Sequence, residues 1–173
     1  MRVFINDANI LIDIVKLDLL SQFSELSYDL YTTDFILEEI NQEQRLEIDR
    51  LIDEGKFNII FTSDIKDFQA INDLLKNASG LSFEDCSAWY YTKKMNGTLI
   101  TGDKKLRKMV EKNGIEVRGL IFILDEILNQ ELISFPDAVQ KIELLYQLND
   151  RLPQNELEKR IRLWKNNTRL LQK

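Results

Sequence analysis

Two aspartates follow short apolar segments of the chain, each at the point where a predicted strand gives way to a predicted helix. Asp7 comes after a strand predicted at 2–5, and Asp103 comes after a strand predicted at 98–101. In open parallel sheets, ligands bind beyond the carboxyl ends of the strands, near the point where the strand order reverses. Two carboxylates carried there by two strands can face one cleft, so the sequence predicts a ligand site at that edge.

Two further acids lie in predicted helices. Asp85 is in the first turn of a helix predicted at 83–95, and Glu39 is in a short helix predicted at 34–40. The chain contains no histidine, which excludes a Ser-His-Asp triad and a zinc ion held by histidines. Three or four converging carboxylates suit a hard cation such as Mg²⁺, which takes oxygen ligands, can activate water and can stabilise charge on phosphoryl oxygens.

Each of these acids also has a purely structural interpretation. Asp7 and Asp103 occupy positions where Asp is a favoured helix N-cap. Ser82 followed by Asp85 resembles a capping box with Asp in place of Glu. Glu39 has other glutamates nearby and suits a solvated helix face. Residue type and spacing alone leave the capping and the metal-binding interpretations both open.

The composition is that of one globular domain. The 173 residues are 44% hydrophobic and 30% charged, and this length suffices for one sizeable core. No run of about 18 apolar residues occurs, so we expect no membrane span. The N-terminus lacks the features of a secretory signal, and the single cysteine, Cys86, cannot form an internal disulfide. Both observations favour a reducing cytoplasm.

Predicted strands alternate with predicted helices along the chain, which is typical of a parallel sheet covered by helices on both faces. Besides the elements already named, strands are predicted at 30–32, 57–61 and 116–118, and helices at 8–20, 43–54, 64–76, 104–112, 120–128, 137–148 and 155–171.

The first and last acids lie in motifs that resemble the PIN-domain family. In VFINDANILIDI an apolar strand is followed by Asp, a small residue and Asn before an apolar helix. The resemblance implies a metal-binding role for Asp7, with Asn9 as a polar helper. In TLITGDKKLRKMVEKNGIEVRG a strand leads through Thr-x-Asp into a basic helix. This implies a metal-binding role for Asp103, with Thr101 as a supporting hydroxyl.

Two further motifs complete the acid set that the resemblance implies. TTDFILEEI is similar to a family helix in which Glu precedes an apolar residue, which selects Glu39 rather than Glu38. LSFEDCSAW is similar to a segment in which Asp opens a helix, which selects Asp85 rather than Glu84. Lysines follow Asp103 where many family members carry another acid, so a site with four carboxylates depends on Glu39.

The resemblance covers about residues 2–130 and implies a three-layer α/β/α fold with a central parallel sheet of about five strands, plus C-terminal helices. A nuclease domain would span 1–133, and a helical extension at 134–173 would pack on the same domain or on a partner. The implied activity is endonuclease hydrolysis of RNA, with Mg²⁺ or Mn²⁺ held by Asp7, Asp85 and Asp103 and with Glu39 as a fourth catalytic carboxylate.

Family resemblance also implies candidate partners. Many bacterial members are toxins neutralised by an antitoxin protein, so RNA and an antitoxin are the expected partners. A catalytically inactive PIN-like module that binds RNA or protein is the alternative. A phosphatase of the haloacid dehalogenase type would need Asp-x-Asp after its first strand, but Asn9 stands at the second position.

Basic side chains cluster after the last acid. Lys104, Lys105 and Lys108 lie in the first turns of the helix predicted at 104–112. Contact with the RNA phosphate backbone is one interpretation of these lysines, and a solvated helix face explains them equally well.

An aromatic run and an apolar helical stripe also have two interpretations each. Trp89, Tyr90 and Tyr91 either stack on bases or belong to the core. The helix predicted at 155–171 either closes the core or provides an interface, for example in a homodimer. Its apolar stripe consists of Leu157, Ile161, Trp164 and Leu171.

Overall fold

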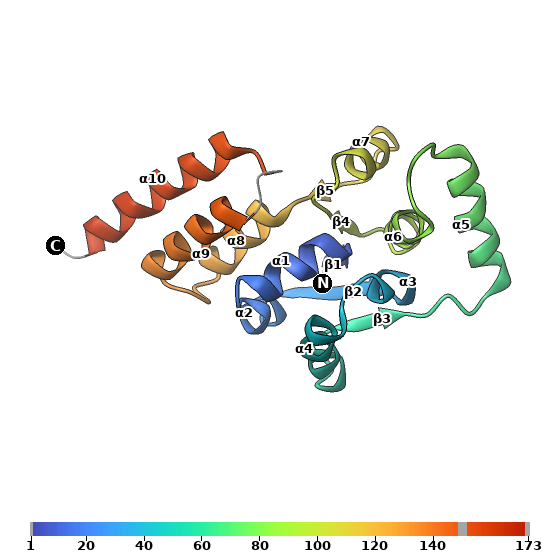
Figure 1. Cartoon of the computed structure of the whole chain (residues 1–173), viewed down its shortest axis with the longest axis horizontal. Helices are drawn as coiled ribbons and strands as arrows, with labels where there is room; N and C mark the ends of the chain where they lie inside the picture. Colours follow the sequence, from blue (N-terminus) through green and yellow to red (C-terminus); the bar gives the residue numbers. More distant parts are fainter. Residues whose placement is uncertain (1, 149–151, 172–173) are drawn as a thin grey trace.

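A five-stranded parallel sheet forms the centre of the molecule (Figure 1). A computed structural model describes residues 2–148 and 152–171, without the side chains of residues 148 and 167–171. The strand order is β3-β2-β1-β4-β5, and every neighbouring pair is parallel. The predicted α/β fold with a parallel sheet of five strands is therefore confirmed. The strands are β1 (Arg2–Asn6), β2 (Tyr28–Thr33), β3 (Asn58–Ile60), β4 (Thr98–Ile100) and β5 (Val117–Arg118).

Two helical layers cover the sheet. Because the chain crosses the sheet in one direction from β1 to β3 and in the other from β3 to β5, right-handed connections place most of the connecting helices of the two halves on opposite faces. One layer contains α1 (Ala8–Lys16), α2 (Leu20–Ser24), α4 (Gln42–Asp53) and α8 (Leu120–Asn129), which contact one another. The other contains α3 (Asp34–Glu38), α5 (Ile65–Asn77), α6 (Phe83–Lys94) and α7 (Lys104–Lys112). In this layer α6 contacts each of the other three helices.

The strand order reverses between β1 and β4, because β4 pairs with the edge of β1 that faces away from β2. Ile5 pairs with Leu99, and Asn6 pairs with Ile100, so the two strands end at the same level. Their following residues therefore leave the sheet side by side at its carboxyl edge, which is the position where open α/β sheets bind ligands.

The long helix predicted at 8–20 is interrupted in the structure. α1 ends at Lys16 and α2 begins at Leu20. Between them Asp18 adopts a left-handed backbone conformation, with φ of 52°, which Asp tolerates better than most residues. Leu17 and Leu19 on either side are both buried. The continuous-helix prediction was wrong because the chain gains more by turning both leucines into the core than by continuing the helix.

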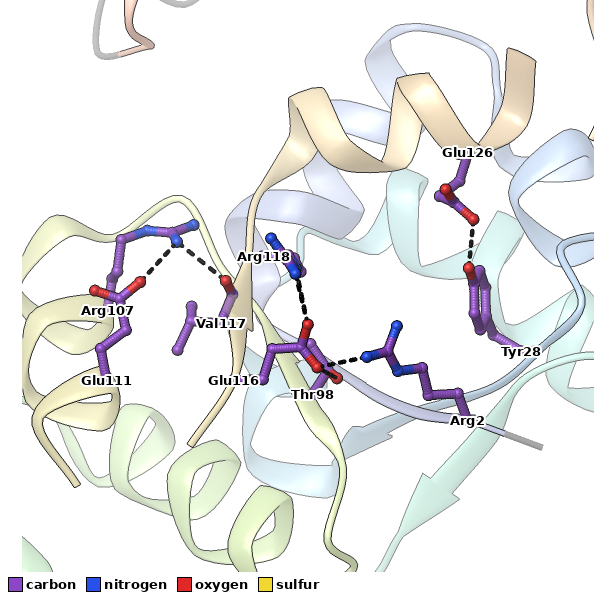
Figure 2. Close-up of polar contacts among 9 residues, drawn as sticks. All are labelled: Arg2, Tyr28, Thr98, Arg107, Glu111, Glu116, Val117, Arg118 and Glu126. Atoms are coloured by element: carbon purple, nitrogen blue, oxygen red, sulfur yellow. Dashed lines mark hydrogen bonds and ion pairs between the residues drawn. The ribbon is translucent and has the colours of Figure 1, made fainter. Parts of the chain in front are cut away.

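An ion-pair cluster joins the strands at the amino edge of the sheet, opposite the strand ends that carry the acids. The carboxylate of Glu116 accepts hydrogen bonds from Arg2 at 2.9 Å, Thr98 at 3.0 Å and Arg118 at 2.7 Å. Figure 2 shows these contacts converging where β1, β4 and β5 begin. A single glutamate thus holds the short edge strand β5 in register.

Arg107 of α7 joins β4 and β5 nearer the carboxyl edge of the sheet. Its guanidinium donates to the backbone carbonyl group of Thr101 at 3.0 Å. It also donates to the carbonyl group of Val117 at 3.3 Å and to the carboxylate of Glu111 (Figure 2). These bonds clamp the ends of β4 and β5 to α7. Arg107 is therefore a structural residue, although it lies within the basic segment that follows Asp103.

The last two helices form a hairpin that packs against α8. They are α9 (Phe135–Leu148) and α10 (Gln154–Leu171). Leu157 and Trp164 of α10 are buried, and Arg160 pairs with Asp125 of α8 at 3.0 Å. The side chain of Leu171, the fourth residue of the predicted stripe, lies outside the described residues. No helix within 2–148 and 152–171 has the length and apolar composition needed to cross a membrane.

The burial of α10 predicts a large difference between two leucine substitutions on the same helix. Leu157 is fully buried, whereas Leu163 is 58% exposed. We expect Leu157→Ala to lower the free energy of unfolding by about 2–5 kcal/mol because it leaves a cavity between α9 and α10. Leu163→Ala should change it by less than about 0.5 kcal/mol. Urea denaturation measures both values, and equal effects would mean that α10 is not packed on α9 in solution.

Candidate active site

Asp7 lies at the carboxyl end of β1 with its side chain only 4% exposed. Its Oδ1 accepts the backbone N–H of Ala8 at 2.7 Å, which helps to cap α1. Its Oδ2 accepts hydrogen bonds from the hydroxyl of Thr101, at 2.6 Å, and from the amide of Asn9. Three donors therefore fix one buried carboxylate in one orientation.

Thr101 and Asn9 connect the ends of β1 and β4. The buried hydroxyl of Thr101 donates to Asp7 and accepts the backbone N–H of Asp103 at 3.0 Å. The Oδ1 of Asn9 accepts the backbone N–H of Gly102 at 2.8 Å. A Cβ at residue 102 would lie 3.0 Å from that oxygen, so glycine allows this close approach. Both predicted helper residues thus lie where they can position the acids.

Asp103 and Asp85 cap helices with one carboxylate oxygen each. Oδ1 of Asp103 accepts the backbone N–H groups of Lys105 and Leu106 at the start of α7. Oδ2 of Asp85 accepts the N–H of Ser82, whose hydroxyl accepts the N–H of Asp85, and this completes a capping box. The capping interpretation of both acids is confirmed. The second oxygen of each makes no hydrogen bond within the described residues, so capping and ligand binding are compatible.

Burial and like charge raise the pKa values of the clustered acids. Burial raises the pKa of Asp7 to about 6, an effect that the Thr101 hydrogen bond opposes and the charge of Asp85 reinforces. Burial also raises the pKa of Asp85, and the charges of Asp103 and Glu84 act in the same direction. Asp7 and Asp103 therefore both lie within electrostatic range of Asp85, and the structure brings the three aspartates to one edge of the sheet.

Glu39 completes the cluster from the end of α3. The residue is exposed and forms the C-cap of that helix. Partial burial of its carboxyl group, followed by the charges of Asp7, Glu84 and Asp85, raises its pKa to about 7. Glu84 is a member of the electrostatic cluster that sequence reasoning set aside in favour of Asp85. Its position next to Asp85, in the first turn of α6, was the signal that could have included it.

The donor set fits a hard, partly hydrated cation. All the charged groups are carboxylates, and burial raises the pKa of the neighbouring Cys86 thiol to about 11. No three acidic or cysteine side chains within 2–148 and 152–171 are spaced to enclose an ion directly. Mg²⁺ commonly uses one or two carboxylates and keeps several waters. The buried Oδ1 of Asn6, directly before Asp7, has no hydrogen-bond partner among the described residues.

The three lysines of the predicted RNA contact lie on the surface of α7. Lys104, Lys105 and Lys108 are exposed, and within the described part of the chain none of them forms an ion pair. Lys105 extends across the turn before α6, where its Nζ would lie 1.8 Å from a Cβ at Gly80. The lysines therefore extend along α7 from the end that Asp103 caps.

The pKa of Asp7 predicts that the metal-free protein loses stability as the pH rises. The value is 3.8 for an unperturbed carboxyl group and about 6 in the folded protein. A raised acid pKa contributes stability that is fully present below pH 3.8 and is lost as the pH rises through 6. The loss amounts to about 3 kcal/mol. We expect Asp7→Asn to remove this part of the decline, as measured by urea unfolding in EDTA between about pH 4 and pH 7.

A matched variant controls for the change in net charge. Asp53 is an exposed residue at the end of α4, in the other helical layer, and it lies outside the cluster. The Asp53→Asn curve should therefore run parallel to that of the wild-type protein. Glu39 adds to the decline in all three proteins, but by less in Asp7→Asn, because the charge of Asp7 contributes to the raised Glu39 pKa. A parallel curve for Asp7→Asn as well would contradict the destabilising effect of its buried charge.

Some solved structures are similar to this chain. No curated protein matches the chain in sequence. One similar solved structure is VapBC2 from Rickettsia felis bound to a DNA fragment from its promoter, with 13% identity over 68% of this chain and 98% of that chain and a TM-score of 0.48. Another is VapBC-1 from nontypeable Haemophilus influenzae, with 17% identity over 69% of this chain and 98% of that chain and a TM-score of 0.47. A third is a PilT N-terminus domain protein from Sulfolobus solfataricus P2, with 14% identity over 73% of this chain and 93% of that chain and a TM-score of 0.43.

The family assignment itself comes from sequence. A family model described as PIN domain matches residues 3–166, which include nearly the whole sheet, the four predicted acids and most of α10. The protein therefore belongs to the PIN-domain family.

Proposed function

We propose that the protein is a metal-dependent endoribonuclease that hydrolyses phosphodiester bonds in RNA. One observation carries this proposal: Asp7, Asp85 and Asp103 form a repelling cluster at the switch point of a parallel sheet, with the pKa of Asp7 raised to about 6. Repelling carboxylates at such an edge favour a bound cation, because the cation removes the repulsion. Membership in a family whose members are generally nucleases supports the same activity.

In this proposal Asp7, Asp85 and Asp103 hold Mg²⁺ or Mn²⁺, and Glu39 assists as a fourth carboxylate. When bound, such a cation supplies an activated water and neutralises charge on the phosphoryl oxygens. Thr101 and Asn9 keep the buried carboxylate of Asp7 facing one direction through their hydrogen bonds. The products, by family resemblance, carry a 5′-phosphate and a 3′-hydroxyl.

The lysines of α7 bind the substrate in this proposal. Lys104, Lys105 and Lys108 are exposed and next to the acid cluster, so they can neutralise phosphates on the strand that enters the site. By resemblance to bacterial PIN proteins that act as toxins, an antitoxin protein would be the regulatory partner. A cytoplasmic location is consistent with that role.

A second candidate function is a PIN-like module that binds RNA or protein without cleaving it. The observation that favours it is the wide spacing of the acids, since no three of them within the described residues enclose an ion directly. Metal-dependent cleavage separates the two functions. We favour the nuclease because a partly hydrated cation needs fewer direct ligands.

The nuclease proposal predicts that isosteric amide substitutions abolish cleavage. Asp7→Asn and Asp103→Asn keep a capping oxygen, since Asn caps about as well as Asp, but remove a charge from the cluster. We expect each to lower the rate of RNA cleavage in Mn²⁺ by more than about 100-fold, beyond the effect typical of outer-sphere partners. Asp53→Asn, outside the cluster, should keep the wild-type rate. Gel analysis of a labelled single-stranded RNA gives the rates.

Metal dependence is tested in the same preparations. EDTA should abolish cleavage by the wild-type protein, and Mn²⁺ should raise its melting temperature, because a ligand that binds only the folded state stabilises it. Asp7→Asn should reduce that rise. Cleavage that persists in EDTA or in both Asn variants would rule out this mechanism. A rise in melting temperature without any cleavage would favour the non-cleaving module.

The proposed pairing of lysines with phosphates predicts a change in salt dependence. Replacing Lys104 and Lys108 together with Ala should weaken binding of single-stranded RNA to a similar extent for all sequences. The slope of log affinity against log salt should fall in magnitude by about 0.7 for each phosphate that the variant no longer neutralises. Fluorescence anisotropy in EDTA measures this binding without cleavage. An unchanged slope would assign both lysines to a solvated helix face.

A further inference from the structure

A hollow lies on the outer surface of α6, between α5 and the end of α7. Its volume is about 680 Å³, which is in the range of ligand pockets. We call it the α6 groove. Residues of α6 form its floor, residues of α5 form one wall, and the C-cap of α7 closes the other side. The lining residues are Ala70, Asp73, Leu74, Asn77, Trp89, Tyr90, Lys93, Lys94 and Asn113.

The floor of the α6 groove is aromatic and rigidly held. Tyr90 is half-buried, and its hydroxyl donates to the carboxylate of Asp67 at 2.6 Å. Lys94 pairs with the same carboxylate at 2.6 Å and lies 5.6 Å from the centre of the Tyr90 ring. Trp89 also lines the groove, although it is only 6% exposed. A fixed aromatic ring at the surface is suited to stacking against a planar group.

Further lysines lie beside this floor and along α7. Lys93 borders the groove, is exposed and forms no ion pair with any described residue. On α7, Lys105, Lys108 and Lys112 follow one another at intervals of three and four residues, so they share one helix face. The helix ends at Asn113, which lines the groove. Asp73 is the only acid in the lining, and Lys76 neutralises it at 2.9 Å.

α7 connects this groove to the acid cluster. The helix begins at the Asp103 cap and ends at Asn113, so its nine residues span about 13 Å. Lys105, in its first turn, crosses to the turn at Gly80 that leads from α5 towards α6. The basic face of α7 therefore forms a continuous positive track from the proposed catalytic edge to the aromatic floor.

We propose that the α6 groove is a binding subsite for single-stranded RNA, in which a base stacks on Tyr90 and the flanking phosphates contact Lys93 and Lys112. The inference rests on the proposed nuclease function, because the strand continues from the acid cluster along α7. An acidic peptide would also pair with these lysines. The aromatic floor and the continuity with the acid cluster favour nucleic acid, since RNA supplies both planar bases and regularly spaced negative charge.

The first test compares two charge reversals in matched positions. Lys93 and Lys16 are both exposed lysines in the last turn of a helix, but Lys16 is on α1, on the opposite face of the sheet. Binding of a single-stranded RNA of about 12 nucleotides is measured in EDTA by fluorescence anisotropy. We expect Lys93→Glu to weaken binding by about tenfold at low salt and Lys16→Glu to leave it nearly unchanged. Equal effects of the two variants would overturn the proposal.

The second test identifies what the groove recognises. A strand of the same length without bases should bind several-fold more weakly than the complete strand to the wild-type protein, because each stacked base contributes to affinity. A polyglutamate peptide that binds as tightly as RNA, with the same sensitivity to Lys93→Glu, would overturn the proposal and indicate an acidic protein partner.

The subsite and the catalytic proposal fail in distinguishable ways. Cleavage in Mn²⁺ together with RNA binding that is insensitive to Lys93→Glu would reject the subsite and leave the nuclease intact. Binding that depends on Lys93, without cleavage under any condition, would reject the nuclease and retain the subsite. Thermal melts of every variant confirm that each protein is folded before binding is compared.

Discussion

The parallel pairing of β1 with β4 is the constraint on which the proposed site depends. Asn6 pairs with Ile100, and the backbone N–H of Asp7 continues this pairing with a bond to the Ile100 carbonyl at 3.0 Å. The pairing brings Thr101 within 2.6 Å of the Asp7 carboxylate, although 94 residues separate them in sequence. Without this register neither the carboxylate orientation nor the Asp103 cap would be defined, because Thr101 supports both.

The same arrangement creates a strong separation of charge. Carboxylates of Asp7, Asp85 and Glu39 crowd one side of the strand ends, and burial and mutual repulsion raise their pKa values. The lysines of α7 begin immediately beyond Asp103 and continue to the α6 groove. A polyanion is therefore attracted along α7 and repelled at the acids unless a cation is bound there. This gives a physical reason why metal binding and substrate binding would be coupled.

From sequence, helix capping and metal binding are alternative interpretations of Asp85 and Asp103, whereas the structure makes the two roles compatible. A carboxylate has two oxygens, and in Asp85 and Asp103 one oxygen is bonded to backbone N–H groups at a helix start. The cap fixes the side chain, so the remaining oxygen has a defined position without further hydrogen bonds. An N-capping role therefore does not argue against a functional role for an Asp at a strand end. Arg107 is the opposite case, since it lies in the basic segment after Asp103 but donates to the backbone carbonyl groups of Val117 and Thr101.

The amino-acid sequence was sufficient to predict the alternation of strands and helices, because this depends on local periodicity. It was also sufficient to predict the acids at the strand ends and the polar helpers Asn9 and Thr101, because these belong to motifs that lie within a few residues. Other features arise only when the chain is folded. The turn at Asp18 and the unsatisfied oxygen of Asn6 depend on what packs around each residue. The α6 groove likewise joins three helices that only the folded sheet brings together. Burial and electrostatic coupling arise from neighbours distant in sequence, and no local pattern encodes them.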